Sequence, residues 1–142
     1  MKDIKITIDI TIEGLDEMIE KSEDKNENLI VSKYAVKWNE DSKWFRYSDT
    51  CNRLMLKTVK DYMTTILKQR GYVYLYEVLT ELDIPVHQKY LSVGWVYDEK
   101  NPIGDNEIII TVLDDPEEDG YILDFNVDGD VLSILKKKGK LK

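Results

Sequence analysis

YILDFNVDGDVLSIL, residues 121–135, is the stretch on which the interpretation of the whole chain depends. Its Asp124, Asn126 and Asp128, followed by Gly129, match the opening of a calcium-binding EF-hand loop. The same letters also match a β-hairpin, because Asp-Gly between two apolar runs is a strong short-range turn signal. One interpretation predicts a metal centre, and the other predicts the closing turn of a sheet.

The hairpin accounts for more of this stretch than the calcium loop does. An EF-hand loop needs a bidentate glutamate at its twelfth position, which here is Leu135. Pairing the two runs across the Asp-Gly turn places Leu123 opposite Ile134 and aligns apolar side chains on one face. We therefore expect no metal ion at this stretch, and a strand at residues 130–135.

The region before this turn has the pattern of further strands. Alternating or continuous apolar runs predict strands at residues 92–97, 107–113 and 121–127. Loops rich in Asp, Asn, Pro and Gly separate these runs at spacings typical of consecutive antiparallel strands. Together with residues 130–135 they predict a C-terminal antiparallel meander of four strands.

One long helix is predicted at residues 50–70. Ser48 or Asp49 is suited to cap its start, and Gly71 is suited to end it. Apolar residues at helical spacing predict its buried stripe, which comprises Met55, Val59, Tyr62, Met63 and Ile66.

The remaining elements complete an α+β fold. A shorter helix is predicted at residues 74–82, where Leu75, Val78, Leu79 and Leu82 recur at helical spacing. Alternating isoleucines predict an N-terminal strand at residues 4–12, and an acidic helix follows at 15–23. We expect an N-terminal strand and helix, a central helical layer with one long helix, and the C-terminal meander, in one domain of residues 1–142.

Composition supports a cytosolic protein. The chain has 142 residues, of which 42% are hydrophobic and 34% are charged, and this balance is typical of a soluble domain. The single cysteine, Cys51, allows no internal disulfide, and no apolar run is long enough for a membrane span. We expect no membrane association.

Residues 32–47 combine aromatic and basic side chains. Trp38, Trp44 and Phe45 are interleaved with lysines and with Arg46. Core packing is the favoured interpretation, because aromatics dominate burial and lysines extend past them to solvent. The alternative is a surface that stacks the bases of a single-stranded nucleic acid.

The charge is uneven along the chain. The net charge is −8 overall, yet residues 71–130 alone carry −13, and the tail at 136–142 is basic. In an up-and-down meander the acidic loops gather at the two ends of the sheet. Asp98, Glu99, Asp105, Asp128 and Asp130 would lie at one end, and Asp114, Asp115, Glu117, Glu118 and Asp119 at the other. These ten residues are the candidate partner-binding site, since such a rim attracts basic surfaces and repels nucleic acid.

No catalytic motif stands out. His87 and Cys51 are each the only residue of their type, and no nucleophile signature surrounds any serine. Zinc has no ligand set here. We expect a protein that is not an enzyme and has no cofactor, although paired carboxylates leave a carboxylate-dependent hydrolase as an alternative.

Four stretches in combination resemble an uncharacterised family of proteins encoded by tailed phages and prophages, mostly of Gram-positive bacteria. They are RGYVYLYEVLTELDI at 70–84, GWVYD at 94–98, PIGDN at 102–106 and LDFNVDG at 123–129, and the resemblance spans roughly residues 34–135. It implies an origin in a mobile element and assigns no catalytic or binding residue.

This origin and the acidic charge suggest a function. Small acidic proteins of mobile elements often bind host machinery, and some anti-CRISPR proteins place carboxylates where a nuclease expects phosphates. We expect a non-enzymatic inhibitor that binds a basic surface of host-defence machinery, such as a nucleic-acid-binding nuclease, and has no direct contact with nucleic acid. The alternative is a phage structural or replication accessory protein that makes interactions without mimicry.

Overall fold

The computed structural model describes residues 31–140. Within them, contacts define two compact units, one formed by residues 31–40 and 111–125 and the other by residues 41–110 and 126–140. The predicted strand at 4–12 and helix at 15–23 lie outside the described residues. The α+β class is confirmed, because each unit contains a small sheet and the second unit adds helices.

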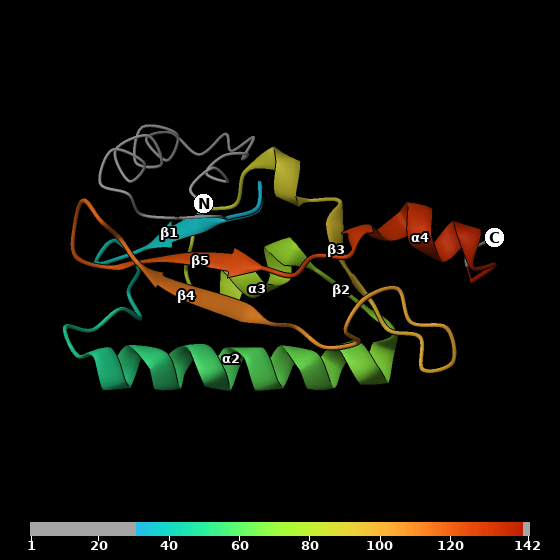
Figure 1. Cartoon of the computed structure of the whole chain (residues 1–142), viewed down its shortest axis with the longest axis horizontal. Coiled ribbons are helices and arrows are strands. Elements are labelled where there is room, and N and C mark those ends of the chain that lie inside the picture. The colour runs from blue at the N-terminus through green and yellow to red at the C-terminus, as the bar shows by residue number, and fades with distance from the viewer. Residues whose placement is uncertain (1–30, 141–142) are drawn as a thin grey trace, which may run out of the picture. The chain divides into compact units, whose positions relative to one another are not determined.

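The first unit is a three-stranded sheet. Strands β1 (Val36–Trp38), β5 (Tyr121–Phe125) and β4 (Ile110–Asp114) lie in the order β1-β5-β4 (Figure 1). Antiparallel pairing brings Trp38 opposite Tyr121, and their rings stack with centroids 6.0 Å apart. Val36 and Trp38 of β1 and Tyr121 of β5 are buried, so this end of the aromatic segment at residues 32–47 serves the core, as predicted.

The long helix of the second unit is confirmed as α2 (Asp49–Arg70). The Ser48 hydroxyl accepts a hydrogen bond from the Cys51 backbone N–H at its start, and Gly71 ends it with a φ of 100°. The predicted stripe is partly wrong, because Tyr62 is 54% exposed. The buried apolar face instead consists of Leu56, Val59, Met63 and Leu67. Val59 and Met63 belong to both sets, whereas Leu56 and Leu67, each one position after a predicted residue, are buried more deeply than Met55 and Ile66.

The second sheet contains three short antiparallel strands. They are β2 (Tyr72–Tyr74), β3 (Val93–Val96) and β6 (Gly129–Asp130), in the order β2-β3-β6. Gly94 lies at the centre, paired with Tyr74 on one side and with Gly129 on the other. A Cβ atom at Gly94 would lie 2.1 Å from the carbonyl oxygen of Val73, so this close strand approach requires glycine.

Two short helical elements follow β2. Helix α3 (Leu75–Glu81) begins directly after the strand, and the Glu77 carboxylate accepts a hydrogen bond from the Tyr74 backbone N–H at 2.9 Å. Its predicted apolar residues, Leu75, Val78, Leu79 and Leu82, are all fully buried. The 3-10 helix η2 (Gln88–Tyr90) then leads into β3.

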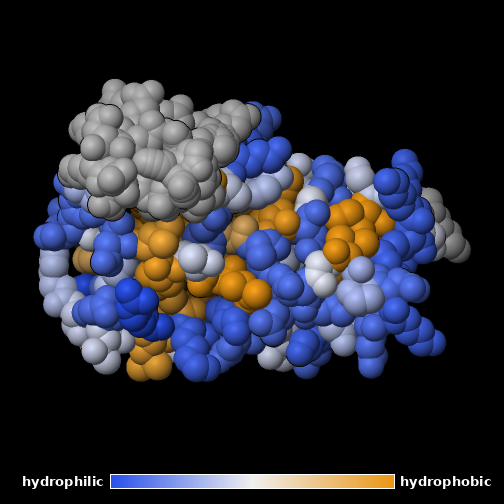
Figure 2. All heavy atoms as spheres, viewed as in Figure 1, coloured by the Kyte–Doolittle hydropathy of each residue, from blue (hydrophilic) through white to orange (hydrophobic). Residues whose placement is uncertain are grey.

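The strand predicted at residues 130–135 is wrong, because helix α4 (Val131–Lys137) forms there. The Asp130 carboxylate accepts a hydrogen bond from the Ser133 backbone N–H at 2.9 Å and caps this helix. Val131 and Leu135 lie one turn apart and pack on Val96, and all three are buried. The surface around α4 is mixed, with a hydrophobic patch among hydrophilic side chains (Figure 2). The short run VLSIL at 131–135, apolar apart from Ser133, fits a strand and a helix equally well, so the cap and these tertiary contacts decide.

The predicted hairpin and four-strand meander are therefore absent from the described residues. Ile134, expected to face Leu123 across the hairpin, lies on α4, and Leu123 pairs with Val36 of β1 instead. The other three predicted strands exist as β3, β4 and β5, but they are divided between the two sheets. Asp128 and Gly129 lead from β5 to β6 instead of reversing the chain.

Candidate functional site

A polar network joins the three C-terminal motifs of the second unit, and Asn126 is its centre. The Asn126 side-chain oxygen accepts hydrogen bonds from Trp95 Nε1 and from the Ile109 backbone N–H, both at 2.8 Å. Its amide nitrogen donates to Asp105 Oδ2 at 2.9 Å and to the Glu107 carbonyl at 3.0 Å. All four hydrogen-bonding positions of the amide are used, so Asn126 fixes three separate segments against one another.

Asp128 forms the second connection within this network. Its Oδ2 accepts a hydrogen bond from the Val96 backbone N–H at 2.9 Å. Its other oxygen lies so close to Gly104 that a Cβ there would be 2.3 Å away. Burial raises the pKa of the Asp128 carboxyl above its ordinary value, and nearby Asp105 adds to this effect. The carboxylate is thus enclosed by two segments of its own chain.

Asp98 organises the loop at residues 98–106, which we call the 98–106 loop. Its Oδ1 accepts hydrogen bonds from the backbone N–H groups of Lys100 and Asn101. The Asn106 side-chain oxygen accepts a hydrogen bond from the Asp98 backbone N–H, and the Asn106 amide donates one to the Asp98 carbonyl. The ammonium of Lys138 lies 2.8 Å from Asp98 Oδ2. The hydrogen bond from Lys138 and those from the loop hold the Asp98 pKa at about 2.

The predicted acidic residues of the second unit therefore differ in role. Asp98, Asp128 and Asp130 each accept hydrogen bonds that hold a loop, a strand or a helix end. Asp105 is exposed and is bound by Asn126, and Glu99 is exposed on the 98–106 loop. The network brings Asp105 and Asp128 together, and it uses most of these carboxylates within the protein.

The other five predicted residues lie in the first unit, on the turn after β4 at residues 114–119, which we call the acidic turn. Lys37 Nζ lies 3.3 Å from Glu118 Oε2 and 3.9 Å from Asp115 Oδ2. The Asp115 side chain is only 1% exposed, and burial raises its pKa. The other four members are exposed, namely Asp114, Glu117, Glu118 and Asp119. Neither Asp114 nor Asp119 forms an ion pair with any residue that the structure describes.

Gly120 explains why the acidic turn can close. Its φ is 130°, which a residue with a side chain rarely adopts. A Cβ there would lie 2.7 Å from the carbonyl oxygen of Trp38 in β1. The backbone of the turn therefore packs closely against the neighbouring strand, and four of its five carboxylates are exposed while the Asp115 side chain is buried.

Sequence reasoning missed several of the polar residues that hold the second unit together. Asn126 was noted only as a calcium-loop position, and Ser42 and Asn52, the buried polar residues of the described core, were not singled out. A signal was available for Asn126, because a polar side chain directly after the apolar run at 121–125 needs partners if it is buried. Nothing in the local sequence identifies those partners.

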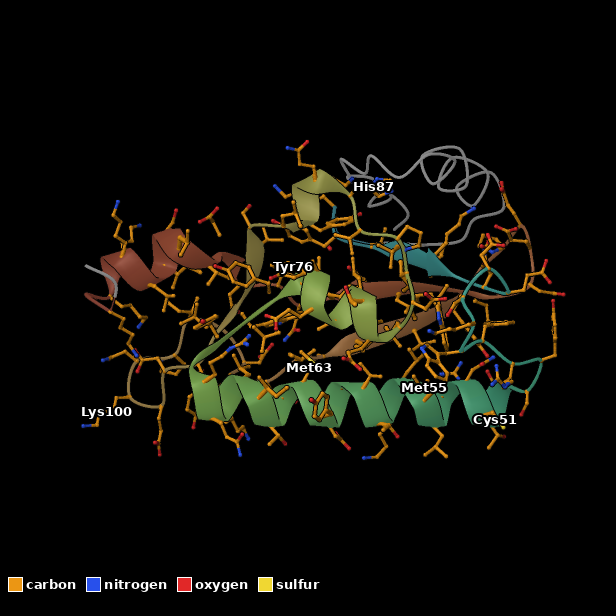
Figure 3. All side chains as sticks on the ribbon, turned by 180° about the vertical axis from the view of Figure 1, so that it is seen from behind. Cys51, Met55, Met63, Tyr76, His87 and Lys100 are labelled. Atoms are coloured by element: carbon orange, nitrogen blue, oxygen red, sulfur yellow. The ribbon has the colours of Figure 1, made fainter. Side chains whose placement is uncertain are left out.

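Cys51 and His87, residue types that often carry chemistry, lie apart from the polar network described above. Cys51 is exposed on the first turn of α2, and His87 is exposed before η2, its ring packing on Tyr90 (Figure 3). Among residues 31–140 no three His, Cys, Asp or Glu side chains are grouped to hold a metal ion. In that same range no helix has the length and apolar character that crossing a membrane requires.

The fold and its network define a small α+β protein in which sequence motifs hold the scaffold together. A model for a family of unknown function, DUF6353, matches residues 2–135, so the chain belongs to that family. No curated protein and no solved structure matches the chain. Family membership therefore assigns no function to the chain.

Proposed function

We propose that this chain is a non-enzymatic protein of a phage or other mobile element, and that it inhibits host-defence machinery by binding a basic surface with its acidic turn. The supporting observation is the charge of that turn. Five of its six residues are acidic, four are exposed, and Lys37 is the basic residue paired with them among the described residues. An excess of fixed negative charge attracts a cationic partner.

The internal roles of the other carboxylates narrow the proposed surface. Neutralising Asp98, Asp128 or Asp130 would disturb the fold, because each accepts hydrogen bonds from backbone groups. The acidic turn is joined to the scaffold through Asp115 and Gly120, and its other four carboxylates lie at the surface, where Glu118 also contacts Lys37. We therefore assign binding to Asp114, Glu117, Glu118 and Asp119.

The mechanism is substitution of carboxylate for phosphate. Arginine presents a planar fork of N–H donors that binds either group through two parallel hydrogen bonds. A nuclease that holds a nucleic acid in a basic channel is then occupied by the acidic turn instead. The resemblance of the GWVYD, PIGDN and LDFNVDG motifs to tailed-phage proteins supports a role of this kind, with inhibition of a Cas9-type nuclease as its specific form.

The test is inhibition of a purified Cas9-type nuclease, measured as cleavage of target DNA. The test variant changes the four exposed carboxylates to amides, as Asp114→Asn, Glu117→Gln, Glu118→Gln and Asp119→Asn, and leaves Asp115 in place. A matched control neutralises four exposed carboxylates elsewhere, as Glu40→Gln, Asp41→Asn, Glu81→Gln and Glu99→Gln. We expect the test variant alone to lose inhibition.

Salt provides the second measurement. Binding by surface charge weakens as the screening length falls from roughly 10 Å at 0.1 M salt to roughly 3 Å at 1 M. Inhibition that persists unchanged at high salt, or in the amide variant, would show that the acidic turn does not carry the activity. A chain that never inhibits the nuclease would rule out the Cas9-type form of the proposal.

A further inference from the structure

Residues 42–47 of the second unit, which we call the 42–47 loop, carry two exposed aromatic side chains. Trp44 is 41% exposed and Tyr47 is 71% exposed, whereas Phe45 between them is buried. The ring of Tyr47 meets that of Phe45 edge to face, with centroids 5.5 Å apart. Phe45 therefore anchors the loop in the core, and two large rings are presented to solvent on either side of it.

Side chains hold the backbone of this loop in place. The buried Ser42 hydroxyl donates to the Leu82 carbonyl at 2.7 Å and accepts from the Trp44 backbone N–H at 3.2 Å. The Asp83 carboxylate accepts a hydrogen bond from the Lys43 backbone N–H at 2.8 Å.

Asn52 of α2 also holds the backbone of the 42–47 loop, at Arg46. It is only 2% exposed, its oxygen accepts from the Arg46 backbone N–H at 2.8 Å, and its amide donates to the Arg46 carbonyl at 2.6 Å. Ser42 and Asn52 are the buried polar side chains of the described core, and both act on this loop. A surface fixed in this way loses little conformational entropy when it binds a ligand.

Two cations flank the exposed rings. Lys43 Nζ lies 5.2 Å from the centroid of the Trp44 ring, and Arg46 Nη1 donates to the carbonyls of Lys43 and Phe45. Neither side chain is within ion-pair distance of a carboxylate in the described part of the chain. Arg53 and Lys57 on the neighbouring helix do have such partners, in Asp49 and Asp61.

We propose that the 42–47 loop is a binding site for a short single-stranded nucleic acid, in which Trp44 and Tyr47 stack on bases and Lys43 and Arg46 contact phosphates. Aromatic rings beside unpaired cations are the combination that recognises unpaired nucleotides without regard to sequence. Core packing accounts for Trp38 and Phe45, which are buried. It does not account for Trp44 and Tyr47, which are exposed, and for these two the nucleic-acid alternative is favoured. This site is independent of the acidic turn.

The site has only two cations, which limits how strongly its affinity for nucleic acid depends on salt. With two phosphate contacts, the logarithm of the affinity falls with the logarithm of salt concentration at a slope of about −1.4, from roughly −0.7 per contact on a single strand. An acidic protein segment docked on the same two cations lacks bases to stack on the rings. The response to base-stacking probes therefore separates the two kinds of ligand.

Trp44 supplies its own readout. The other two tryptophans, Trp38 and Trp95, are each 1% exposed, so quenching of the exposed tryptophan reports on the loop. The experiment titrates the full chain with an eight-nucleotide oligothymidylate in low salt and follows tryptophan fluorescence, together with polarisation of a labelled oligonucleotide. A ten-residue polyglutamate peptide serves as the acidic comparison.

Variants assign the effect to the loop. Tyr47→Ala and Trp44→Ala are each expected to weaken binding by at least about fivefold, the loss of one base stack. Tyr62→Ala is the matched control, because Tyr62 is similarly exposed but lies on the middle of α2. Lys43→Gln should lower the salt slope by about 0.7. Its control is Lys100→Gln. Lys100 lies on the 98–106 loop, near the end of α2 that is opposite Cys51 (Figure 3).

The outcomes are distinct. Oligothymidylate binding that is weakened in Tyr47→Ala, by quenching and by polarisation, and in Trp44→Ala, by polarisation because the reporting ring is removed, supports the proposal if Tyr62→Ala binds like the wild type. Absence of quenching and of polarisation change up to millimolar oligonucleotide overturns it. Equal responses to polyglutamate and oligothymidylate also overturn it, because the surface would then recognise negative charge alone.

Discussion

Lys138 and Asp98 tie the end of helix α4 to the 98–106 loop, with Lys138 Nζ 2.8 Å from Asp98 Oδ2. The same ammonium donates to the Asn101 carbonyl at 2.7 Å. Asp98 is 40 residues away from Lys138 along the chain, so this contact closes a long segment. Its strength depends on the charge of the carboxylate, and it should therefore depend on pH.

The pH dependence has a defined direction. The pKa of Asp98 is about 2 in the folded protein, against an ordinary value of 3.8, so the folded state favours the charged form. This contribution to stability is complete above the ordinary pKa and is lost as the pH falls from 3.8 towards 2. We expect the melting temperature to fall over that range in the wild type, and to fall less steeply in Asp98→Asn. Glu99→Gln, on the exposed neighbour, should behave like the wild type; equal curves for all three would show that Asp98 is not responsible.

Asn126→Ala should destabilise the second unit by about 3 kcal/mol, because it removes the acceptor used by Trp95 Nε1 and by the Ile109 N–H. Urea unfolding followed by tryptophan fluorescence measures this loss. Asn101→Ala, a change of the same size in an exposed loop, is expected to cost less than about 0.5 kcal/mol.

Asn126→Asp provides a sharper version of the same test. It keeps the acceptor but places a second carboxylate beside Asp105, in place of the donated hydrogen bond at 2.9 Å. We expect this variant to be less stable than the wild type at neutral pH and to recover part of the loss near pH 4, where carboxyls become protonated. A loss that does not vary with pH would contradict the assigned contact.

Gly104→Ala and Asp128→Ala should be coupled. Alone, Gly104→Ala forces a methyl group to a position 2.3 Å from Asp128 Oδ1, and we expect a cost of about 1–3 kcal/mol. In the Asp128→Ala background that oxygen is absent, so the same change should cost markedly less. A double-mutant cycle measured by urea unfolding isolates the interaction. Additive effects would mean that the two residues are not in contact.

Asn52→Ala should reduce stability by about 2 kcal/mol, since it leaves the N–H and the carbonyl of Arg46 without this partner. Thr58→Ala, on an exposed position of the same helix, is the control. We also expect the fluorescence of Trp44 to become more susceptible to acrylamide quenching in Asn52→Ala, as the 42–47 loop loosens. Unchanged quenching would show that Asn52 supports α2 without fixing the loop.

Sequence patterns predicted the elements whose signals are long or have capping residues. The long helix, its Ser48 cap and its Gly71 end are present, and the apolar residues of α3 are buried as expected. The hairpin prediction is wrong because Asp130 followed by VLSIL at 131–135 fits a capped helix as well as a strand. Asp130 caps a helix instead, and the contact of Leu135 with Val96 stabilises it.

The candidate site was predictable as a set of charges and not as an arrangement. The acidic turn appears where sequence placed a loop, and it remains the exposed group of carboxylates in the first unit. The internal roles of Asp98 and Asp128 depend on Lys138 and on Gly104. These contacts join segments far apart in the chain, and no local pattern encodes such pairings.

The Asn126 network also gives three of the sequence motifs a structural role. GWVYD supplies Trp95 and Val96, PIGDN supplies Gly104 and Asp105, and the third motif supplies Asn126 and Asp128. These letters are thus a signature of architecture. Substitutions within these motifs are therefore expected to alter stability, whereas substitutions in the 42–47 loop or the acidic turn can alter binding while the scaffold is kept.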